Sequence, residues 1–263
     1  MSQDHTVSFA VDGVAVVTGA AQGIGQAAAV ALAQQGADVA LVDRDPGRCA
    51  ETAGMVEALG RRALALGCDV ADKDAVEACA ERVVAELGPI TALATCAGVL
   101  TENVTAEQVR DADLDTLWAV NVKGSFNWAV AASRSMIPAG RGSIVLISSQ
   151  AALVSLPSQA GYSMSKGAVA TLARSLAIDW AKHSVTVNAI CPTFIWTPMA
   201  APMLEIPEVH AAAIRRIPIG RVGQPKDIGG VIAFLCSPAA SLITGVVLPV
   251  DGGWTAGEPE LPL

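Results

Sequence analysis

The chain has 263 residues, of which 52% are hydrophobic and 4% aromatic, with a formal net charge of −8 and a sequence pI near 4.8. A chain of this length buries roughly three quarters of its unfolded surface and needs no disulfide or structural metal to fold. Its acidic net charge argues against nucleic acid as a partner. No stretch of about 18 residues is apolar enough to span a membrane, and the isolated histidines and scattered cysteines show no metal-ligand spacing.

The start of the chain, Met1 to Val11, contains Asp4 and His5 and lacks the basic and apolar regions of a signal peptide. The scattered cysteines are typical of reduced thiols in a core rather than of disulfides. We therefore expect a cytoplasmic protein.

Short apolar runs alternate with helical segments along the chain. Strands are expected at 14–18, 38–43, 63–68, 92–96, 143–148, 185–190 and 246–250. Helices are expected at 24–35, 46–59, 73–87, 114–136, 161–182 and 227–235. Gly36 and Gly60 mark two helix ends, and Pro46 marks a helix start. After Pro192 the alternation breaks, so residues 193–222 are expected to form an excursion with short helices.

This alternation predicts the α/β fold class with one domain over residues 1–263: a doubly wound, mostly parallel sheet (Rossmann fold) of about seven strands with helices on both faces. Right-handed crossovers place the carboxyl ends of all strands on one edge. Ligands bind at that edge, near the point where the strand order reverses. The Pro-containing tail 257–263 is expected outside the core.

A glycine-rich turn, Thr18-Gly19-Ala20-Ala21-Gln22-Gly23-Ile24-Gly25, joins the first strand to the first helix. Glycines allow a tight turn, and the free N–H groups at the helix start favour a pyrophosphate. We therefore expect Gly19, Gln22, Gly23, Ile24 and Gly25 to bind a dinucleotide. The weaker alternative is that this turn merely needs glycine to connect a strand to a helix.

Asp43 ends the second strand, 18 residues after Gly25. A carboxylate there accepts hydrogen bonds from ribose hydroxyls and repels a 2′-phosphate, which favours NAD over NADP. Arg44 is the counter-argument, since it could reach a phosphate, and Asp43 could also cap the helix near Pro46. Asp69, which with Val70 follows the third strand, is expected beside the adenine or as a helix N-cap.

Tyr162 is the only tyrosine, and Lys166 follows it by four residues on an expected helix, so both lie on one face. An ammonium about 5 Å away, at an effective dielectric constant of about 20, favours the phenolate by roughly 3 kcal/mol. That corresponds to about two pKa units, enough for proton transfer near neutral pH. This spacing is common by chance, however, and a helical tyrosine is usually a core residue.

With these motifs in order, the sequence resembles the short-chain dehydrogenase/reductase family, in the branch of about this length, over roughly residues 13–254. The motifs that carry the resemblance are Thr18–Gly25, Asp69-Val70, Ala97-Gly98, Asn121, Ser149, Tyr162, Lys166 and Asp251-Gly252-Gly253. The resemblance implies hydride transfer between NAD(H) and a secondary alcohol or ketone, with Tyr162 as general acid and base.

The resemblance also implies the remaining catalytic roles. Ser149 would hold the substrate oxygen, with Ser148 as its less critical neighbour. Asn121 would bend its helix and anchor a water that leads to Lys166, which would also bind the nicotinamide ribose. The structural alternatives are a strand end for Ser149 and a helix kink for Asn121.

Further cofactor contacts are implied at Ala97, Gly98 and Pro192, and at Ile195 and Thr197 for the nicotinamide carboxamide.

Two positions depart from the family pattern. Thr95-Cys96 stands where the family usually has Asn-Asn before Ala97-Gly98, and the asparagine normally braces neighbouring strands. Thr193 stands where a glycine usually follows Pro192, which restricts the backbone beside the nicotinamide.

The substrate is weakly encoded. Candidate pocket residues are Ala151, Leu153, Gln159, Trp196, Met199 and Met203. They suit a small polyol, hydroxyketone or cyclic alcohol about as well as a lipid ketone.

Two other functions stay open. A 3-oxoacyl-carrier-protein reductase would need basic residues around the mouth of the site, where only Arg141 and His183 are expected, in a chain that is itself acidic. An NAD-sensing scaffold would usually lack Tyr162 or Lys166. The resemblance also implies a homotetramer built on the helices 114–136 and 161–182, although the same Ala-rich faces could cover the sheet.

Overall fold

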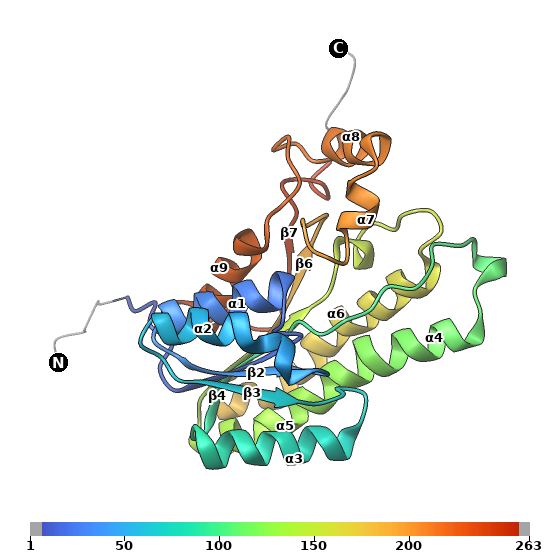
Figure 1. The fold of residues 1–263 in the computed structure, drawn as a ribbon. Coiled ribbons are helices and arrows are strands. Elements are labelled where there is room, and N and C mark those ends of the chain that lie inside the picture. The colour runs from blue at the N-terminus through green and yellow to red at the C-terminus, as the bar shows by residue number, and fades with distance from the viewer. Residues whose placement is uncertain (1–6, 258–263) are drawn as a thin grey trace.

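The computed structural model describes residues 7–257. Within them lies one seven-stranded sheet in the order β3-β2-β1-β4-β5-β6-β7, and every neighbouring pair of strands is parallel. Helices cover both faces (Figure 1). The expected doubly wound fold is confirmed, and the strand order reverses between β1 and β4.

The strands agree with those expected from the sequence to within two residues at each end. They are β1 (Val14–Thr18), β2 (Asp38–Asp43), β3 (Ala63–Gly67), β4 (Ile90–Thr95), β5 (Gly142–Ile147), β6 (Val185–Pro192) and β7 (Val247–Val250). Successive side chains of a strand point to opposite faces. In β1, Val14 and Val16 therefore pack in one hydrophobic core, whereas Ala15 and Val17 pack in the other.

The α-helices form the two outer layers. They are α1 (Gly23–Gln34), α2 (Ala50–Ala58), α3 (Lys73–Glu86), α4 (Asp111–Leu117), α5 (Gly124–Ala139), α6 (Ala160–Trp180), α7 (Ala201–Leu204), α8 (Pro207–Arg216) and α9 (Pro225–Cys236). One core joins the sheet to α1, α2 and α9, and the other joins it to α3, α5 and α6. The carboxyl edge of the sheet, where a ligand is expected to bind, is thus held between two packed layers of helices.

Two expected helices are divided. The segment 46–59 starts with a 3₁₀ turn, Pro46–Cys49, before α2 begins. The expected single helix 114–136 consists of α4, a π-helical turn at Trp118–Lys123, and α5. A π-helical turn inserts an extra residue into a helix and often marks a functional position. Here the turn carries Asn121.

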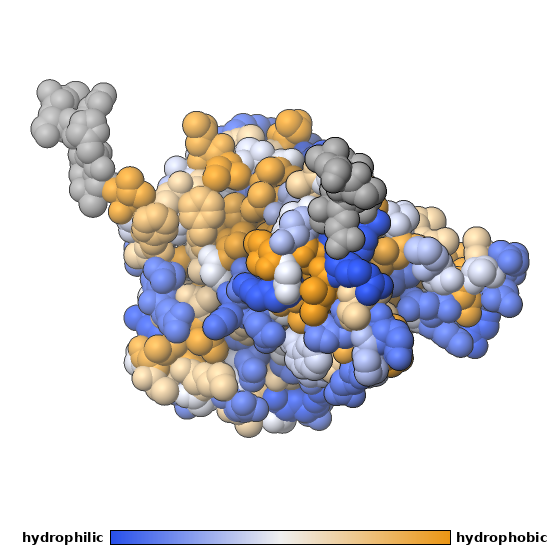
Figure 2. Space-filling view, turned by 90° about the horizontal axis from the view of Figure 1, so that it is seen from above, coloured by the Kyte–Doolittle hydropathy of each residue, from blue (hydrophilic) through white to orange (hydrophobic). Residues whose placement is uncertain are grey.

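Residues 193–222 contain α7 and α8, which lie beyond the sheet, above β6 and β7 in Figure 1. Seen from above, this side has hydrophobic residues gathered near its centre, between hydrophilic ones (Figure 2). No helix within residues 7–257 is long and apolar enough to cross a membrane. Apart from Gly257, the tail expected outside the core lies outside the described residues, as do Asp4 and His5.

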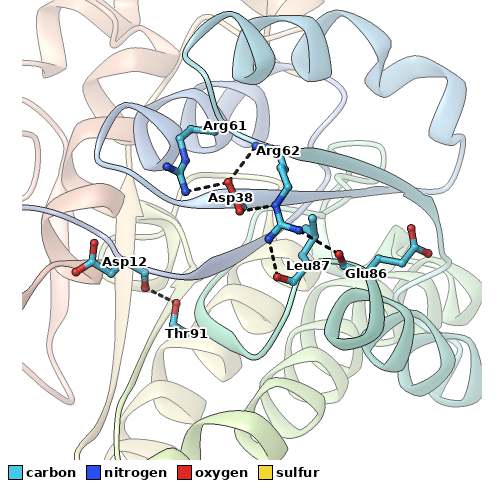
Figure 3. A network of polar contacts seen from close by, with 7 residues as sticks. All are labelled: Asp12, Asp38, Arg61, Arg62, Glu86, Leu87 and Thr91. Carbon is cyan, nitrogen blue, oxygen red and sulfur yellow. Dashed lines mark hydrogen bonds and ion pairs between the residues drawn. The ribbon is translucent and has the colours of Figure 1, made fainter.

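A polar network joins three segments at the amino edge of the sheet (Figure 3). Asp38, the first residue of β2, accepts hydrogen bonds from the backbone and Nε of Arg62 at 3.0 and 2.7 Å, and its carboxylate lies 2.9 Å from Arg61. Arg62 also donates to the carbonyls of Glu86 and Leu87. Burial alone would raise the pKa of Asp38, but these hydrogen bonds and charges together lower it. The network fixes the edge opposite the functional site.

Candidate active site

A cavity of about 450 Å³ opens at the carboxyl edge of the sheet. Its lining comes from the segments that follow β1 to β6, from α6, and from residues 192–203. Because the strands are ordered β3-β2-β1-β4-β5-β6, the residues after β2 and β3 lie on one side and those after β5 and β6 on the other. The cavity therefore spans the reversal between β1 and β4, where such sheets bind nucleotides.

The turn between β1 and α1 forms a cradle that requires glycine. A Cβ on Gly25 would clash with the carbonyl oxygen of Gly19, and Gly19 itself has a φ of +64°. The first turn of α1 contains no acidic residue, and Gln22 makes no side-chain cap, so the helix N–H groups face the cavity uncapped. Gly19, Gln22, Gly23, Ile24 and Gly25 all line it. This arrangement suits a pyrophosphate.

The side of the cavity after β2 and β3 holds both carboxylates and guanidinium groups. Asp43 Oδ2 accepts a hydrogen bond from the N–H of Ala21 at 3.3 Å. Arg44 lines the cavity, and so does Arg48, which donates to Gln22 Oε1 at 2.8 Å. Arg48 was not foreseen from the sequence. It is a second cation near Asp43, contributed by the 3₁₀ turn that follows β2.

The alternative roles for two aspartates as helix caps are wrong. Asp45, rather than Asp43, caps the turn that begins at Pro46, because its side chain accepts from the N–H of Gly47. Asp72, rather than Asp69, is the N-cap of α3. Asp69 and its neighbour Val70 line the cavity instead, where the sequence placed the adenine.

Tyr162, Lys166 and Ser149 meet at the other side of the cavity. Lys166 is 6% exposed, and its Nζ donates to the carbonyl of Ile147 at 2.9 Å and lies 5.8 Å from the centre of the Tyr162 ring. Ser149 ends the extended segment after β5, and its Oγ accepts from the N–H of Ala151. A hydroxyl pair beside a buried ammonium can bind an oxygen and move a proton.

The expected acidity of Tyr162 is wrong for the protein alone. Burial raises the pKa of Tyr162, and the hydrogen bond from Ser149 opposes this only in part. Burial also lowers the pKa of Lys166 to about 8. The sequence estimate included the attraction between the two groups and left out the loss of hydration that accompanies their burial.

Asn121 is 1% exposed and connects the π-helical turn to the loop after β4. Its Oδ1 accepts from the N–H of Val99 at 2.8 Å, and its Nδ2 donates to the carbonyl of Val99 and to Ser165 Oγ, both at 3.1 Å. A Cβ on Gly98 would lie 3.3 Å from Asn121 Oδ1 and 3.5 Å from Lys166 Nζ. Asn121 and Lys166 therefore both lie next to the backbone of Gly98, which has no side chain to separate them from it.

The two departures from the family pattern lie on the cavity wall. Thr18 Oγ1 accepts from the N–H of Ala97 at 3.0 Å and so ties the ends of β1 and β4 together, a bracing role the sequence left without a candidate. Cys96 and Thr193 line the cavity, and burial raises the pKa of the Cys96 thiol to about 12. Thr193 Oγ1 is buried and has no hydrogen-bond partner within residues 7–257.

The substrate candidates divide into two groups. Gln159, Met199 and Met203 line the cavity, and Ala151, Leu153 and Trp196 do not. Trp196 instead packs edge-on against His210 of α8. The implied cofactor residues Ala97, Gly98, Pro192, Ile195 and Thr197 all line the cavity.

Several lining residues were missed, among them Leu100, Asn103, Gln150, Leu156 and Phe194. Gln150 directly follows Ser149 and Phe194 directly precedes Ile195, and this adjacency to predicted site residues was the available signal.

The basic residues expected at the mouth of the site lie elsewhere. Arg141 directly precedes β5, and His183 lies two residues before β6. Both are at the amino edge, because the cavity residues follow the opposite ends of those strands. The expectation that Arg141 and His183 border the active site is therefore wrong, since each is separated from it by the length of a strand.

Known proteins match this chain over nearly its whole length. The family model described as Enoyl-(Acyl carrier protein) reductase matches residues 19–255. A D-threitol dehydrogenase from Mycolicibacterium smegmatis is 38% identical over 248 residues, covering 94% of this chain and 95% of the relative. The galactitol 2-dehydrogenase (L-tagatose-forming) of Cereibacter sphaeroides is 39% identical over 258 residues, covering 96% and 99%.

Among solved structures, a gluconate 5-dehydrogenase from Burkholderia cenocepacia in complex with NADP and tartrate has a TM-score of 0.90 at 32% identity, covering 95% of this chain and 98% of the other. These matches confirm the resemblance seen in the motifs. They support a nicotinamide cofactor and an alcohol or ketone as the reacting group, while leaving the choice between NAD and NADP to other arguments. The chain belongs to the short-chain dehydrogenase/reductase family and is an oxidoreductase that transfers a hydride between a nicotinamide cofactor and a secondary alcohol or ketone.

Proposed function

We propose that this protein is an NAD-dependent dehydrogenase of a small secondary alcohol, in which Tyr162 is the general acid and base. The observation that carries the proposal is the convergence of Tyr162, Ser149 and Lys166 on one cavity with the glycine cradle at Gly19 and Gly25. The cradle supports a bound dinucleotide, because Gly25 lets the start of α1 pack against Gly19 and the uncapped first turn of the helix lines the cavity. A bound nicotinamide ring would supply the hydride acceptor and a positive charge beside the phenol.

Each residue would act at a defined atom. The Ser149 hydroxyl would hold the alcohol oxygen, and Tyr162 would take its proton during oxidation and return one during reduction. The buried Lys166 ammonium would stabilise the phenolate and bind the ribose, while Asn121 would keep the loop after β4 in place through Val99. Hydroxyl groups fixed in this way lower the cost of orienting the reacting oxygen.

The relatives support a small hydroxylated substrate. Enzymes named for threitol and galactitol match almost the full length of the chain. The substrate we propose is a small polyol, hydroxyketone or cyclic alcohol. An acyl-carrier substrate is less favoured, because the basic residues considered for carrier docking lie at the amino edge of the sheet.

We further propose that NAD is preferred over NADP. Asp43 lines the cavity at the end of β2, where its charge would repel a 2′-phosphate. Arg44 and Arg48 act in the opposite direction, and a structural relative binds NADP. The test is the ratio of kcat/KM for NAD to that for NADP. We expect this ratio to exceed about tenfold in the wild type and to fall in Asp43→Ser, and a wild-type preference for NADP would refute the assignment.

The proposed chemistry is tested by Tyr162→Phe in an alcohol and ketone panel followed at 340 nm. Removing a general acid and base should lower kcat by about 100- to 10,000-fold, while NADH binding, followed by fluorescence, should stay within about threefold. Wild-type activity in Tyr162→Phe would refute the role of the tyrosine. Tight NADH binding with no turnover of any alcohol by the wild type would favour the alternative of an NAD-sensing scaffold.

The homotetramer is proposed on a separate observation. Apolar side chains are exposed along the outer helices, with Trp118 at 45%, Phe126 at 46%, Met164 at 53% and Ile178 at 81%. Covering such a surface with a second copy would remove it from water. Light scattering should give the mass of a tetramer for the wild type and a smaller species for Ile178→Glu, and a monomeric wild type would refute the proposal. The six unpaired cysteines fit the proposed cytoplasmic location.

A further inference from the structure

A third hydrophobic core lies next to the cavity, separate from the two cores that flank the sheet. Its buried members come from residues 193–222 and from the segment after β7: Leu204, Ala213, Ile217, Val222 and Trp254. Three partly buried residues, Leu156, Phe194 and Ala200, pack against this core and also line the cavity. The position of this wall of the cavity therefore depends on how the third core is packed.

Within residues 7–257, Trp254 is the buried member of the third core that comes from outside residues 193–222. It is 4% exposed and does not line the cavity. The centre of its ring lies 5.5 Å from that of Phe194, and the guanidinium of Arg216 in α8 lies 5.6 Å from the ring. Contacts of an aromatic ring with a second ring and with a cation are both favourable. Trp254 thus links the cavity wall at Phe194 to the end of α8.

The turn after β7 gives Trp254 a defined position. Asp251 is 7% exposed, and its Oδ1 accepts a hydrogen bond from the N–H of Gly253 at 2.9 Å. Gly252 has a φ of +63°, and a Cβ there would lie 2.6 Å from the side chain of Ile217. The turn therefore packs closely against the residue that follows α8, and this contact requires glycine.

The proton-transfer groups stand on a different part of the molecule. Tyr162 and Lys166 belong to α6, which packs in the core shared with α3 and α5, and Ser149 follows the central strand β5. The glycine cradle begins α1, which packs in the core shared with α2 and α9. Neither of these cores contains Trp254. Loss of its ring should therefore displace the wall at Phe194 while the reacting groups and the cradle stay in place.

We propose that Trp254 is a positioning residue for the alcohol substrate: it holds Phe194 in the cavity wall and so sets the affinity for a molecule that it does not touch. This inference rests on the proposed function and adds a residue to its substrate side. A displacement of about 1 Å at a distance from the chemistry can cost about 100-fold in rate or binding. Because Tyr162, Ser149 and Lys166 are anchored elsewhere, we expect the loss mainly in KM.

The test compares Trp254→Ala and the less disruptive Trp254→Leu with the wild type. Kinetics are followed on the alcohol that the wild type oxidises best among threitol, galactitol and cyclohexanol. Both variants should raise the KM for the alcohol by about 10- to 100-fold, with kcat within about fivefold. Trp254→Phe, which keeps an aromatic ring beside Phe194, should restore KM to within about threefold. Binding of ADP, which carries the adenosine and pyrophosphate of the cofactor, should stay within about twofold in all three variants by calorimetry.

Trp180→Ala is the matched control, because it removes the same ring from the end of α6, where Trp180 packs against the core shared with α3 and α5 and does not line the cavity. It should leave the KM for the alcohol within about threefold. An unchanged KM in Trp254→Leu, an equal rise in Trp180→Ala, or a matching loss of ADP binding would overturn the inference and leave the proposed function standing. A wild type that turns over none of the alcohols in the full panel would overturn both.

Discussion

Replacing Lys166 by methionine should make the protein more stable at neutral pH and inactive. Burial lowers the pKa of Lys166 from 10.5 to about 8, with the side chain only 6% exposed. Keeping a charged ammonium in a site where hydration is lost therefore lowers the unfolding free energy of the protein. Methionine fills a similar volume without a charge, so that cost disappears together with the ammonium that the reaction needs.

The size and sign of the effect follow from linkage. A pKa of about 8 in the folded state, against 10.5 in the unfolded state, corresponds to roughly 3 kcal/mol. Below pH 8 both states hold the proton, so the full cost is present. Between pH 8 and 10.5 only the unfolded state holds it, and wild-type stability rises with pH relative to the variant. The hydrogen bond from Nζ to the Ile147 carbonyl offsets about 1 to 2 kcal/mol of the cost at pH 7.

The assay is urea unfolding of the cofactor-free wild type and Lys166→Met at several pH values from 7 to 10.5. We expect the variant to be about 1 to 2 kcal/mol more stable at pH 7. The difference in unfolding free energy should then move in favour of the wild type by roughly 3 kcal/mol as the pH rises. Parallel curves over this range would show that Lys166 titrates as a hydrated lysine and would refute the burial argument.

Three further predictions concern a charged residue in a polar network, a glycine beside the active site and a glycine on an open helix surface. Asp38→Asn, in the network of Figure 3, should lower the unfolding free energy by about 1 to 2 kcal/mol at pH 7 with kcat unchanged. Because the pKa of Asp38 is lowered in the folded state, this difference should vanish as the pH falls below about 4, and a pH-independent difference would contradict the assignment. Gly98→Ala should lower kcat/KM at least about tenfold, since its Cβ would crowd Asn121 Oδ1 at 3.3 Å beside Lys166; unchanged kinetics would show that the loop after β4 shifts to accommodate the added methyl group. Gly54→Ala, with nothing within 4 Å, should raise the unfolding free energy by about 0.5 to 1 kcal/mol, and a loss of stability would contradict the helix argument.

The sequence predicted the order of elements because the alternation of apolar strands and helices is a local pattern. It placed β1 and β2 at their observed ends and identified the cradle from Gly19 to Gly25. It could not place the π-helical turn at Trp118–Lys123, because helical propensity is the same on both sides of that turn. It also could not give the burial that raises the pKa of Tyr162, because loss of hydration depends on neighbours that are distant in the sequence.

The sequence by itself determined the fold class, the family and the candidate catalytic and cofactor residues at the carboxyl edge, because residue spacing along strands and helices is set by local geometry. Only the tertiary structure decided which of those residues share a cavity, that Arg141 and His183 lie at the opposite edge, and that Oε1 of Gln150 is buried without a hydrogen-bond partner among residues 7–257. Such facts depend on burial and on contacts between segments far apart in the chain. Hydrogen-bond satisfaction and desolvation are properties of the packed molecule rather than of any single segment.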